Sequence, residues 1–153
     1  MAGTSPVEIL LVEDNSADEE LTLRALRHNR LANRIHVARD GEEALDFLFC
    51  RHQYSGRSFD SPPRIVLLDL KLPKVNGLEV LRELKHDPRT CAIPTVILTS
   101  SKEERDLIQG YKNGVNSYIQ KPVDFEQFRE TVHHLGMYWL LINAPPPEKA
   151  FAE

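Results

Sequence analysis

This chain has fewer basic than acidic residues. Its 153 residues include 19 Lys and Arg against 23 Asp and Glu, so the formal net charge is −4 at pH 7. Proteins that bind nucleic acids or anionic membranes electrostatically carry the opposite balance, because phosphate groups attract a basic surface. We therefore expect no nucleic-acid partner and no membrane partner.

The chain also lacks a long apolar stretch. Its best candidate, MYWLLI at residues 137–142, falls far short of the roughly 20 residues that a helix needs to cross a bilayer. The first basic residue is Arg24, and Glu8 and Glu13 interrupt the apolar run near the N-terminus, which is not the pattern of a secretory signal peptide. We expect neither a membrane-spanning helix nor a leader.

Cysteine is scarce as well. Cys50 and Cys91 lie far apart and form no CxxC pair, and the six histidines are not spaced from them as zinc ligands are. These absences disfavour a zinc protein and a disulfide-stapled one. They predict two reduced thiols and a cytoplasmic protein.

What the chain does contain is a repeated alternation of strand-like and helix-like segments. Five runs rich in Ile, Val and Leu predict strands. The first, third and fourth are nearly continuous apolar runs, which is typical of a parallel sheet covered by helices on both faces. The expected strands are residues 7–13 (VEILLVE), 34–38 (RIHVA), 64–69 (RIVLLD), 95–100 (TVILTS) and 116–120 (NSYIQ).

Each expected strand is followed by a pair of residues that can cap a helix. In such a pair a short polar side chain accepts from a free N–H at the helix start, and the residue three positions later reaches back. The pairs are Ser16 with Glu19, Asp40 with Glu43, Asn76 with Glu79, Ser101 with Glu104, and Asp124 with Gln127. Five such units predict an α/β protein with a doubly wound five-stranded parallel sheet of order 2-1-3-4-5, the flavodoxin-like arrangement.

The length fits one domain between two short tails. We expect an N-terminal tail at residues 1–6, a domain over residues 7–143 with an extended last helix, and a Pro-rich tail at 144–153. The motif APPP at residues 144–147 ends any helix before it. Residues 51–63 are polar and predict a long exposed loop before the third strand.

Five polar residues fall where the expected strands end. Each has an ordinary explanation when it is taken alone, such as a helix cap, a solvated turn or a surface charge. Ligands of open α/β sheets bind beyond the carboxyl ends of the strands, however, so the gathering of all five at one edge favours a functional site. The five are Glu13 and Asp14 after the first strand, Asp69 after the third, Thr99 after the fourth and Lys121 after the fifth.

Three of these residues are acids that repel one another. At about 4 Å and an effective dielectric near 20, a like-charged pair costs roughly 4 kcal/mol. Lys121 supplies one compensating charge, and Mg²⁺ would supply two more, since it binds carboxylate oxygens and completes its shell with water and phosphate. An ionised Asp69 beside such a metal is suited to attack phosphorus, with Thr99 and Lys121 placed to contact the transferred group.

Four motifs in these positions resemble the receiver domain of bacterial two-component response regulators. They are LLVEDN at residues 10–15, VLLDLKLPKVNG at 66–77, VILTSS at 96–101 and YIQKPVD at 118–124. The resemblance extends from about Val7 to Gly136. It implies the receiver fold, with Asp69 as the phospho-acceptor and with Thr99 and Lys121 in contact with the phosphoryl group.

The resemblance also implies a metal site and a conformational switch. Asp14 and Asp69 would bind Mg²⁺ together with the backbone carbonyl of Lys71, and Glu13, which replaces an Asp common in the family, would help through water. Tyr118 lies where the family has an aromatic switch residue that responds to Thr99. The Lys121–Pro122 peptide bond would be cis.

The C-terminal segment MYWLLINAPPP resembles that of the small regulators that are paired with bacterial and cyanobacterial phytochromes. The implied partner is a histidine kinase of the phytochrome type. Few residues follow Gly136, so we expect no output domain and no enzyme beyond self-catalysed phosphoryl transfer and autodephosphorylation. The chain would signal by protein contacts, with a phosphorelay intermediate, a phosphate sink or a non-phosphorylated pseudo-receiver as alternatives.

Two other protein classes fit less well. Haloacid-dehalogenase phosphatases need a second acid two residues after the nucleophile, where this chain has Lys71. A flavodoxin needs a Ser/Thr/Gly-rich phosphate loop after the first strand, and the acidic EDNSADEE at residues 13–20 would repel a phosphate.

The apolar run at residues 137–142 also predicts self-association. A helix that packs against the domain with one face cannot bury several consecutive residues, because their side chains point in different directions around the helix axis. We expect a homodimer through the face that carries the helix after Ser101, the strand at residues 116–120 and the helix after Asp124, together with the C-terminal tail. The alternative is that the tail folds back on its own domain.

Overall fold

The computed structural model describes residues 7–27, 34–100 and 115–137. Within these ranges five strands form one parallel sheet of order β2-β1-β3-β4-β5, so the predicted flavodoxin-like topology is confirmed. The strands are β1 (Ile9–Val12), β2 (Ile35–Ala38), β3 (Ile65–Asp69), β4 (Thr95–Thr99) and β5 (Ser117–Gln120). Each strand is slightly shorter than the segment expected from the sequence, because the flanking residues of that segment are not paired with a neighbouring strand in the sheet register.

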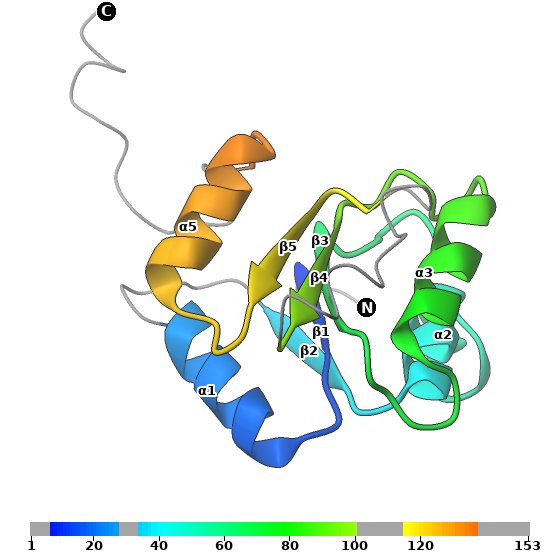
Figure 1. Ribbon diagram of the computed structural model, residues 1–153. Coiled ribbons are helices and arrows are strands. Elements are labelled where there is room, and N and C mark those ends of the chain that lie inside the picture. Colours follow the sequence, from blue (N-terminus) through cyan, green and yellow to red (C-terminus); the bar gives the residue numbers. More distant parts are fainter. Residues whose placement is uncertain (1–6, 28–33, 101–114, 138–153) are drawn as a thin grey trace, which may run out of the picture.

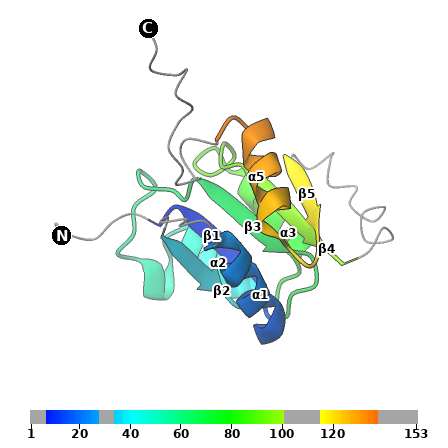
Figure 2. The same ribbon diagram turned by 90° about the vertical axis from the view of Figure 1, so that its left-hand side faces the viewer.

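Helices cover both faces of the sheet (Figures 1 and 2). Helices α1 (Ser16–Leu26) and α5 (Phe125–His134) lie together on one face, and α2 (Gly41–Leu48) and α3 (Gly77–His86) lie on the other. The helix expected after Ser101 falls outside the described residues. None of the helices in the described ranges is long and apolar enough to cross a membrane.

The core divides into two layers because successive side chains of a strand point to opposite faces. Leu10 and Val12 of β1 join the cluster under α2 and α3. Ile9 and Leu11 join the cluster under α1 and α5. Strands β1, β3 and β4 are buried along their whole length, which explains their continuous apolar sequences, whereas the outer strands β2 and β5 are only partly buried.

Three of the predicted helix caps are confirmed. Asp40, Asn76 and Asp124 accept hydrogen bonds from the backbone N–H three residues later, at 2.7, 3.0 and 2.8 Å. The prediction for Ser16 is wrong, since Asn15 caps α1 by accepting from Asp18 N at 2.9 Å. Helix α1 begins one residue earlier than the prediction because Asn15 already has the extended backbone of a cap. Ser101 lies outside the described residues.

Helix α5 ends at His134, and the expected extended helix does not continue through Gly136. Gly136 has φ +73°, a conformation that glycine adopts without strain. Met137 N donates to Val132 O at 2.7 Å and Gly136 N to His133 O at 3.0 Å, which closes the helix end. The rest of the predicted helix and tail, from residue 138, lies outside the described residues.

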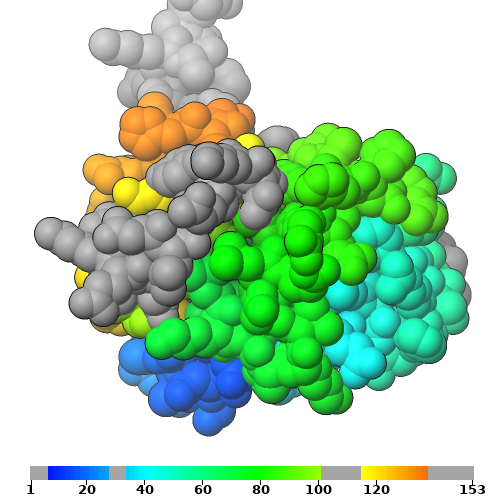
Figure 3. Space-filling view, turned by 45° about the vertical axis from the view of Figure 1, so that its right-hand side comes forward, coloured from blue at the N-terminus to red at the C-terminus, as the bar shows by residue number. Residues whose placement is uncertain are grey.

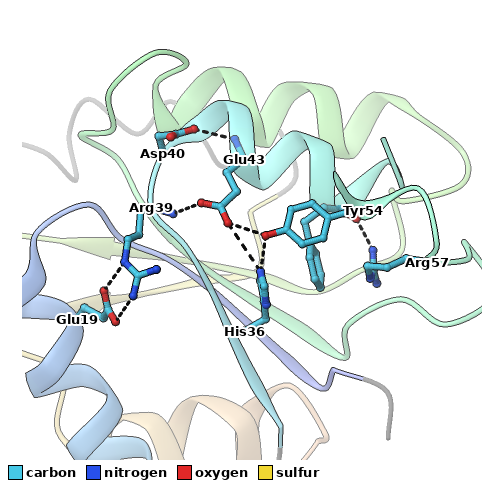
Figure 4. Close-up of polar contacts among 8 residues, drawn as sticks. Glu19, His36, Arg39, Asp40, Glu43, Tyr54 and Arg57 are labelled. Atoms are coloured by element: carbon cyan, nitrogen blue, oxygen red, sulfur yellow. Dashed lines mark hydrogen bonds and ion pairs between the residues drawn. The ribbon is translucent and has the colours of Figure 1, made fainter. Parts of the chain in front are cut away.

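The loop expected to be exposed at residues 51–63 is anchored to the domain (Figure 4). It contains the short helix η2 (His52–Tyr54). The Tyr54 hydroxyl donates to Glu43 of α2 at 2.6 Å and lies 2.8 Å from His36 Nε2 on β2. The Arg57 guanidinium lies 3.7 Å from the centre of the Phe47 ring and donates to the Phe47 carbonyl.

Candidate functional site

The three acids predicted from the strand ends lie together at one edge of the sheet. Strands β1 and β3 pair in parallel with Val12 opposite Leu68. The next residue on each chain segment is Glu13, just after β1, and Asp69, the last residue of β3. One carboxylate oxygen from each of Glu13, Asp14 and Asp69 lies within 4.8 Å of the others. Glu13 is fully buried and Asp69 is 5% exposed, while Asp14 faces solvent.

Lys121 brings the compensating positive charge. It directly follows β5, and its ammonium lies 3.0 Å from Glu13 Oε1 and 3.2 Å from Asp69 Oδ2. Its side chain is 13% exposed. Burial disfavours the charged ammonium, but the ion pairs with Glu13 and Asp69 outweigh that effect and raise the pKa of Lys121. The lysine therefore stays protonated and ties the end of β5 to the ends of β1 and β3 by charge.

Glu13 is a buried carboxylate whose charge needs compensation. Burial raises the pKa of Glu13 to about 7, and the charge of Asp69 adds to the rise while Lys121 opposes it. Its Oε2 accepts from Asn15 N at 3.3 Å. Its buried Oε1 faces Lys121 but completes no hydrogen bond with any described residue. This oxygen is ion-paired with Lys121 at 3.0 Å, and it lies beside two more carboxylates, a set of oxygen ligands that fits a hard divalent cation such as Mg²⁺.

Thr99, at the end of β4, lies between the acids and β5. Lys121 N donates to Thr99 O at 2.6 Å, which links the ends of these two strands. Thr99 is fully buried, and its hydroxyl has no hydrogen-bond partner within the described part of the chain. A buried hydroxyl left in this state can still donate to a group that enters the site.

Tyr118 and Pro122, two of the residues that the resemblance links to a conformational switch, lie on and just after β5. The Lys121–Pro122 peptide bond is cis, as the resemblance implies. Tyr118 is half-buried on β5 and packs against the core cluster on the α2 and α3 side. Both residues thus lie on the strand and turn that carry Lys121.

The loop that contains Lys71 is held against the end of β3. Gly77 N donates to Leu70 O at 2.8 Å. A Cβ added to Gly77 would lie 2.2 Å from Asp69 O and 2.7 Å from Leu70 Cα. Only glycine permits this approach, which fixes where the chain leaves the site after Lys71.

The same loop is held against the first turn of α2. Gly41 N donates to Pro73 O at 3.3 Å, and a Cβ on Gly41 would lie 1.7 Å from Val75 O. Lys74, which has φ +68°, places its ammonium 3.7 Å from Asp40 Oδ2. On the molecular surface α2 (cyan) lies directly against the green region that contains α3 and the segment before it (Figure 3).

One member of the cluster was not identified from the sequence. Asp18 Oδ2, in the first turn of α1, lies 3.2 Å from Lys121 Nζ and accepts a hydrogen bond from it. The available signal was an acid four residues after Asp14, on the first turn of a helix that leaves the site. An acid in a first helical turn is also favoured by the helix dipole, so that signal alone did not indicate a site.

The edge of the sheet thus combines the nearly buried carboxylate of Asp69, three further acids, an ammonium and a hydroxyl without a described hydrogen-bond partner. Such a set can bind a divalent cation and balance the charge of a group attached to Asp69.

Comparisons with known proteins agree with this geometry. Residues 9–133 match the family described as the response regulator receiver domain. The chain is 48% identical over 146 residues to the probable methanogenesis regulatory protein FilR2 of Methanothrix harundinacea, covering 95% of this chain and 92% of that protein.

Two solved structures share the fold and much of the sequence. The bacteriophytochrome response regulator AtBRR is 51% identical with a TM-score of 0.82, over 92% of this chain and 100% of that one. The Mn²⁺-bound form of response regulator Rcp1 is 36% identical with a TM-score of 0.71, over 93% and 99% of the two chains. With its five-stranded sheet and acidic edge, this chain belongs to the response regulator receiver domain family.

Proposed function

We propose that this chain is a single-domain response regulator that accepts a phosphoryl group on Asp69 from a histidine kinase in a Mg²⁺-dependent reaction. In this step an Asp69 carboxylate oxygen forms a bond to phosphorus, and the bond between phosphorus and the kinase histidine breaks. The bonding electrons remain on the histidine nitrogen. The product is an acyl phosphate that carries about two negative charges.

The observation that carries the proposal is the contact between Asp69 and Lys121 inside the acidic cluster. The ammonium lies 3.2 Å from Asp69 Oδ2, where it can balance the charge of phosphoryl oxygens. Thr99 offers its unsatisfied hydroxyl to the same group. Lys121 thus contributes charge and Thr99 contributes a hydrogen bond, while Asp69 is the nucleophile.

Glu13, Asp14 and Asp69 are the residues that would hold Mg²⁺, and the backbone carbonyl of Lys71 would be a further ligand. When bound, the ion supplies positive charge that neutralises the phosphoryl oxygens. The similarity to the Mn²⁺-bound form of response regulator Rcp1 supports a divalent cation at this edge.

The direct test is a phosphate-affinity gel after incubation with a small phosphodonor, with and without Mg²⁺. Wild type should give one shifted band that requires Mg²⁺ and disappears after hydroxylamine, as an acyl phosphate must. Asp69→Asn should give none. Asp46→Asn is the matched control, because Asp46 pairs with His52 away from the site. A shifted band of full intensity in Asp69→Asn would refute the assignment.

We propose a phytochrome-type histidine kinase as the donor, on the strength of the similarity to AtBRR. Transfer from an autophosphorylated bacteriophytochrome kinase should be faster than transfer from an unrelated histidine kinase at equal concentrations. Equal rates would argue against this pairing. The chain would then act through protein contacts and its own autodephosphorylation, or pass the group on as a relay intermediate or sink.

We further propose that the receiver domain extends over residues 7–143, between tails at 1–6 and 144–153. We also propose that two copies associate through the face that carries the helix expected after Ser101, β5 and α5, together with the C-terminal tail. Met137 is buried in the core of its own domain, so the apolar sequence at 138–142 supports this association. Sedimentation should show a dimer for wild type and a monomer for a chain truncated after Gly136. The free thiols Cys50 and Cys91 suit a cytoplasmic location.

A further inference from the structure

Lys121 is shared by an acid that the proposed phosphoryl chemistry does not use. Its ammonium contacts Asp18 as well as Glu13 and Asp69, at 3.2, 3.0 and 3.2 Å. Asp18 lies 103 residues earlier in the chain and on a different element, helix α1. The contact is both an ion pair and a hydrogen bond, and the Asp18 side chain is 38% exposed.

Helix capping does not account for the direction of the Asp18 carboxylate. Asp18 occupies the position whose side chain can reach back to the N–H of the capping residue. That N–H, on Asn15, instead donates to Glu13 Oε2 at 3.3 Å. The Asp18 backbone N–H is itself capped by Asn15 Oδ1. The Asp18 carboxylate is therefore directed to Lys121 and not to the start of its own helix.

The first turn of α1 is held from the other side as well. Glu19, the next residue, makes a two-pronged ion pair with Arg39, in which Nε donates at 3.2 Å and Nη2 at 3.0 Å (Figure 4). Two parallel bonds of this kind orient a carboxylate more firmly than one. Arg39 follows β2, so this turn is tied to β2 by Glu19 and to the β5 end by Asp18.

We propose that Asp18 is a positioning residue that competes with the phosphoryl group on Asp69 for the Lys121 ammonium. This inference rests on the proposed function and concerns the regulation of the same site. In the unphosphorylated protein the ammonium is shared among Asp18, Glu13 and Asp69. A phosphoryl group on Asp69 attracts the ammonium more strongly, and the Asp18 contact then weakens.

The proposal gives opposite signs for two ligands. Loss of the Asp18 charge removes a competitor of the phosphoryl group, so a phosphoryl mimic should bind more tightly. A partly exposed ion pair corresponds to about a two- to fivefold change in affinity. Mg²⁺ alone should bind more weakly, because one negative charge near the cation site is lost and the ammonium is then neutralised by Glu13 and Asp69 alone. A merely structural role for Asp18 would weaken both ligands.

The experiment is calorimetric titration of the full chain with Mg²⁺ alone, and with beryllium trifluoride at saturating Mg²⁺. The variants are Asp18→Asn, Asp18→Glu and Glu20→Gln. Asp18→Glu restores the charge and should return both affinities towards wild type. Glu20→Gln is the matched control, since it removes one carboxylate from the same helix, where Glu20 pairs with the exposed Arg24.

The expected result is tighter binding of beryllium trifluoride and weaker binding of Mg²⁺ in Asp18→Asn, with Glu20→Gln like wild type. Unchanged or weaker binding of beryllium trifluoride in Asp18→Asn, while wild type binds it, would overturn the role of Asp18 and leave the proposed function standing. If wild type itself failed to bind beryllium trifluoride with Mg²⁺, the proposed function would fall, and the role of Asp18 with it.

Discussion

Replacing Gly41 with alanine should test how the Lys71 loop is held. Gly41 is the first residue of α2, and a Cβ built there would lie 1.7 Å from Val75 O, 2.6 Å from Val75 C and 2.8 Å from Val75 Cβ. Two of these atoms belong to the backbone, so a change of side-chain rotamer cannot relieve the overlap. Either the loop or the first turn of α2 must move, and the hydrogen bond from Gly41 N to Pro73 O would lengthen.

The size of the effect follows from two opposing contributions. Overpacking against a fixed neighbour costs about 1–3 kcal/mol, and the contact with backbone atoms places Gly41→Ala near the upper end. Alanine in place of glycine in a helix returns at most about 1 kcal/mol. We expect a net loss of roughly 2 kcal/mol in the free energy of unfolding, or roughly 4–8 °C in Tm for a chain of this size. Mg²⁺ affinity should fall about tenfold, because the displaced loop carries the Lys71 carbonyl.

The assay is thermal unfolding of the metal-free protein, followed by titration with Mg²⁺. Gly56→Ala is the matched control, since nothing lies within 4 Å of a Cβ at Gly56, and it should leave Tm equal or slightly raised. A Gly41→Ala variant with wild-type Tm and wild-type Mg²⁺ affinity would refute the reasoning. A lower Tm with unchanged affinity would show that this contact stabilises the fold without positioning the loop.

Three further measurements test the charge balance and the core. In thermal unfolding without metal, Asp14→Ala should be as stable as wild type or more stable, because the substitution relieves repulsion among the acids. Lys121→Ala should be less stable, because it removes the compensating charge. A clearly destabilised Asp14→Ala would contradict the crowding of the acids. Burial lowers the pKa of His36 below 6.5, so below about pH 6.5 the unfolded chain binds more protons and stability declines. Urea unfolding at pH 7.5 and 5.5 should therefore show a smaller decline in His36→Gln than in wild type. Phe128→Ala, at a fully buried site under α5, should lose about 3–5 kcal/mol in urea unfolding, and a loss under 1 kcal/mol would place Phe128 outside the core.

The order of strands and helices could be predicted from the sequence because it depends on local patterns. Apolar runs, capping residues and the spacing of Phe128 and Val132 act within a few residues of one another, and each favours one kind of element. The position of the site could also be predicted, because parallel strands all end at the same edge. Glu13, Asp69 and Lys121 therefore lie at that edge once the topology is right, and the structure shows the ion pairs between them.

The residue that caps α1 and the contacts of the loop at 51–63 could not be predicted from the sequence. Asn15 and Ser16 are both good caps, and only the backbone conformation at the end of β1 decides between them. The sequence of the loop at 51–63 predicts a polar, exposed segment, yet Tyr54 and Arg57 anchor the loop through partners on α2 and β2. Such partners are set by how the segments pack against one another.

Short-range pattern and strand direction suffice to predict the succession of elements, the topology and the set of charged residues at the carboxyl edge. They do not predict that Asp18 shares Lys121 or that Gly41 packs against Val75, which the packed structure shows. Both contacts join segments that are far apart along the chain, and their distances depend on how α1 and α2 lean against the sheet. No local pattern of residues encodes that angle, since it results from the packing of all the side chains between the elements.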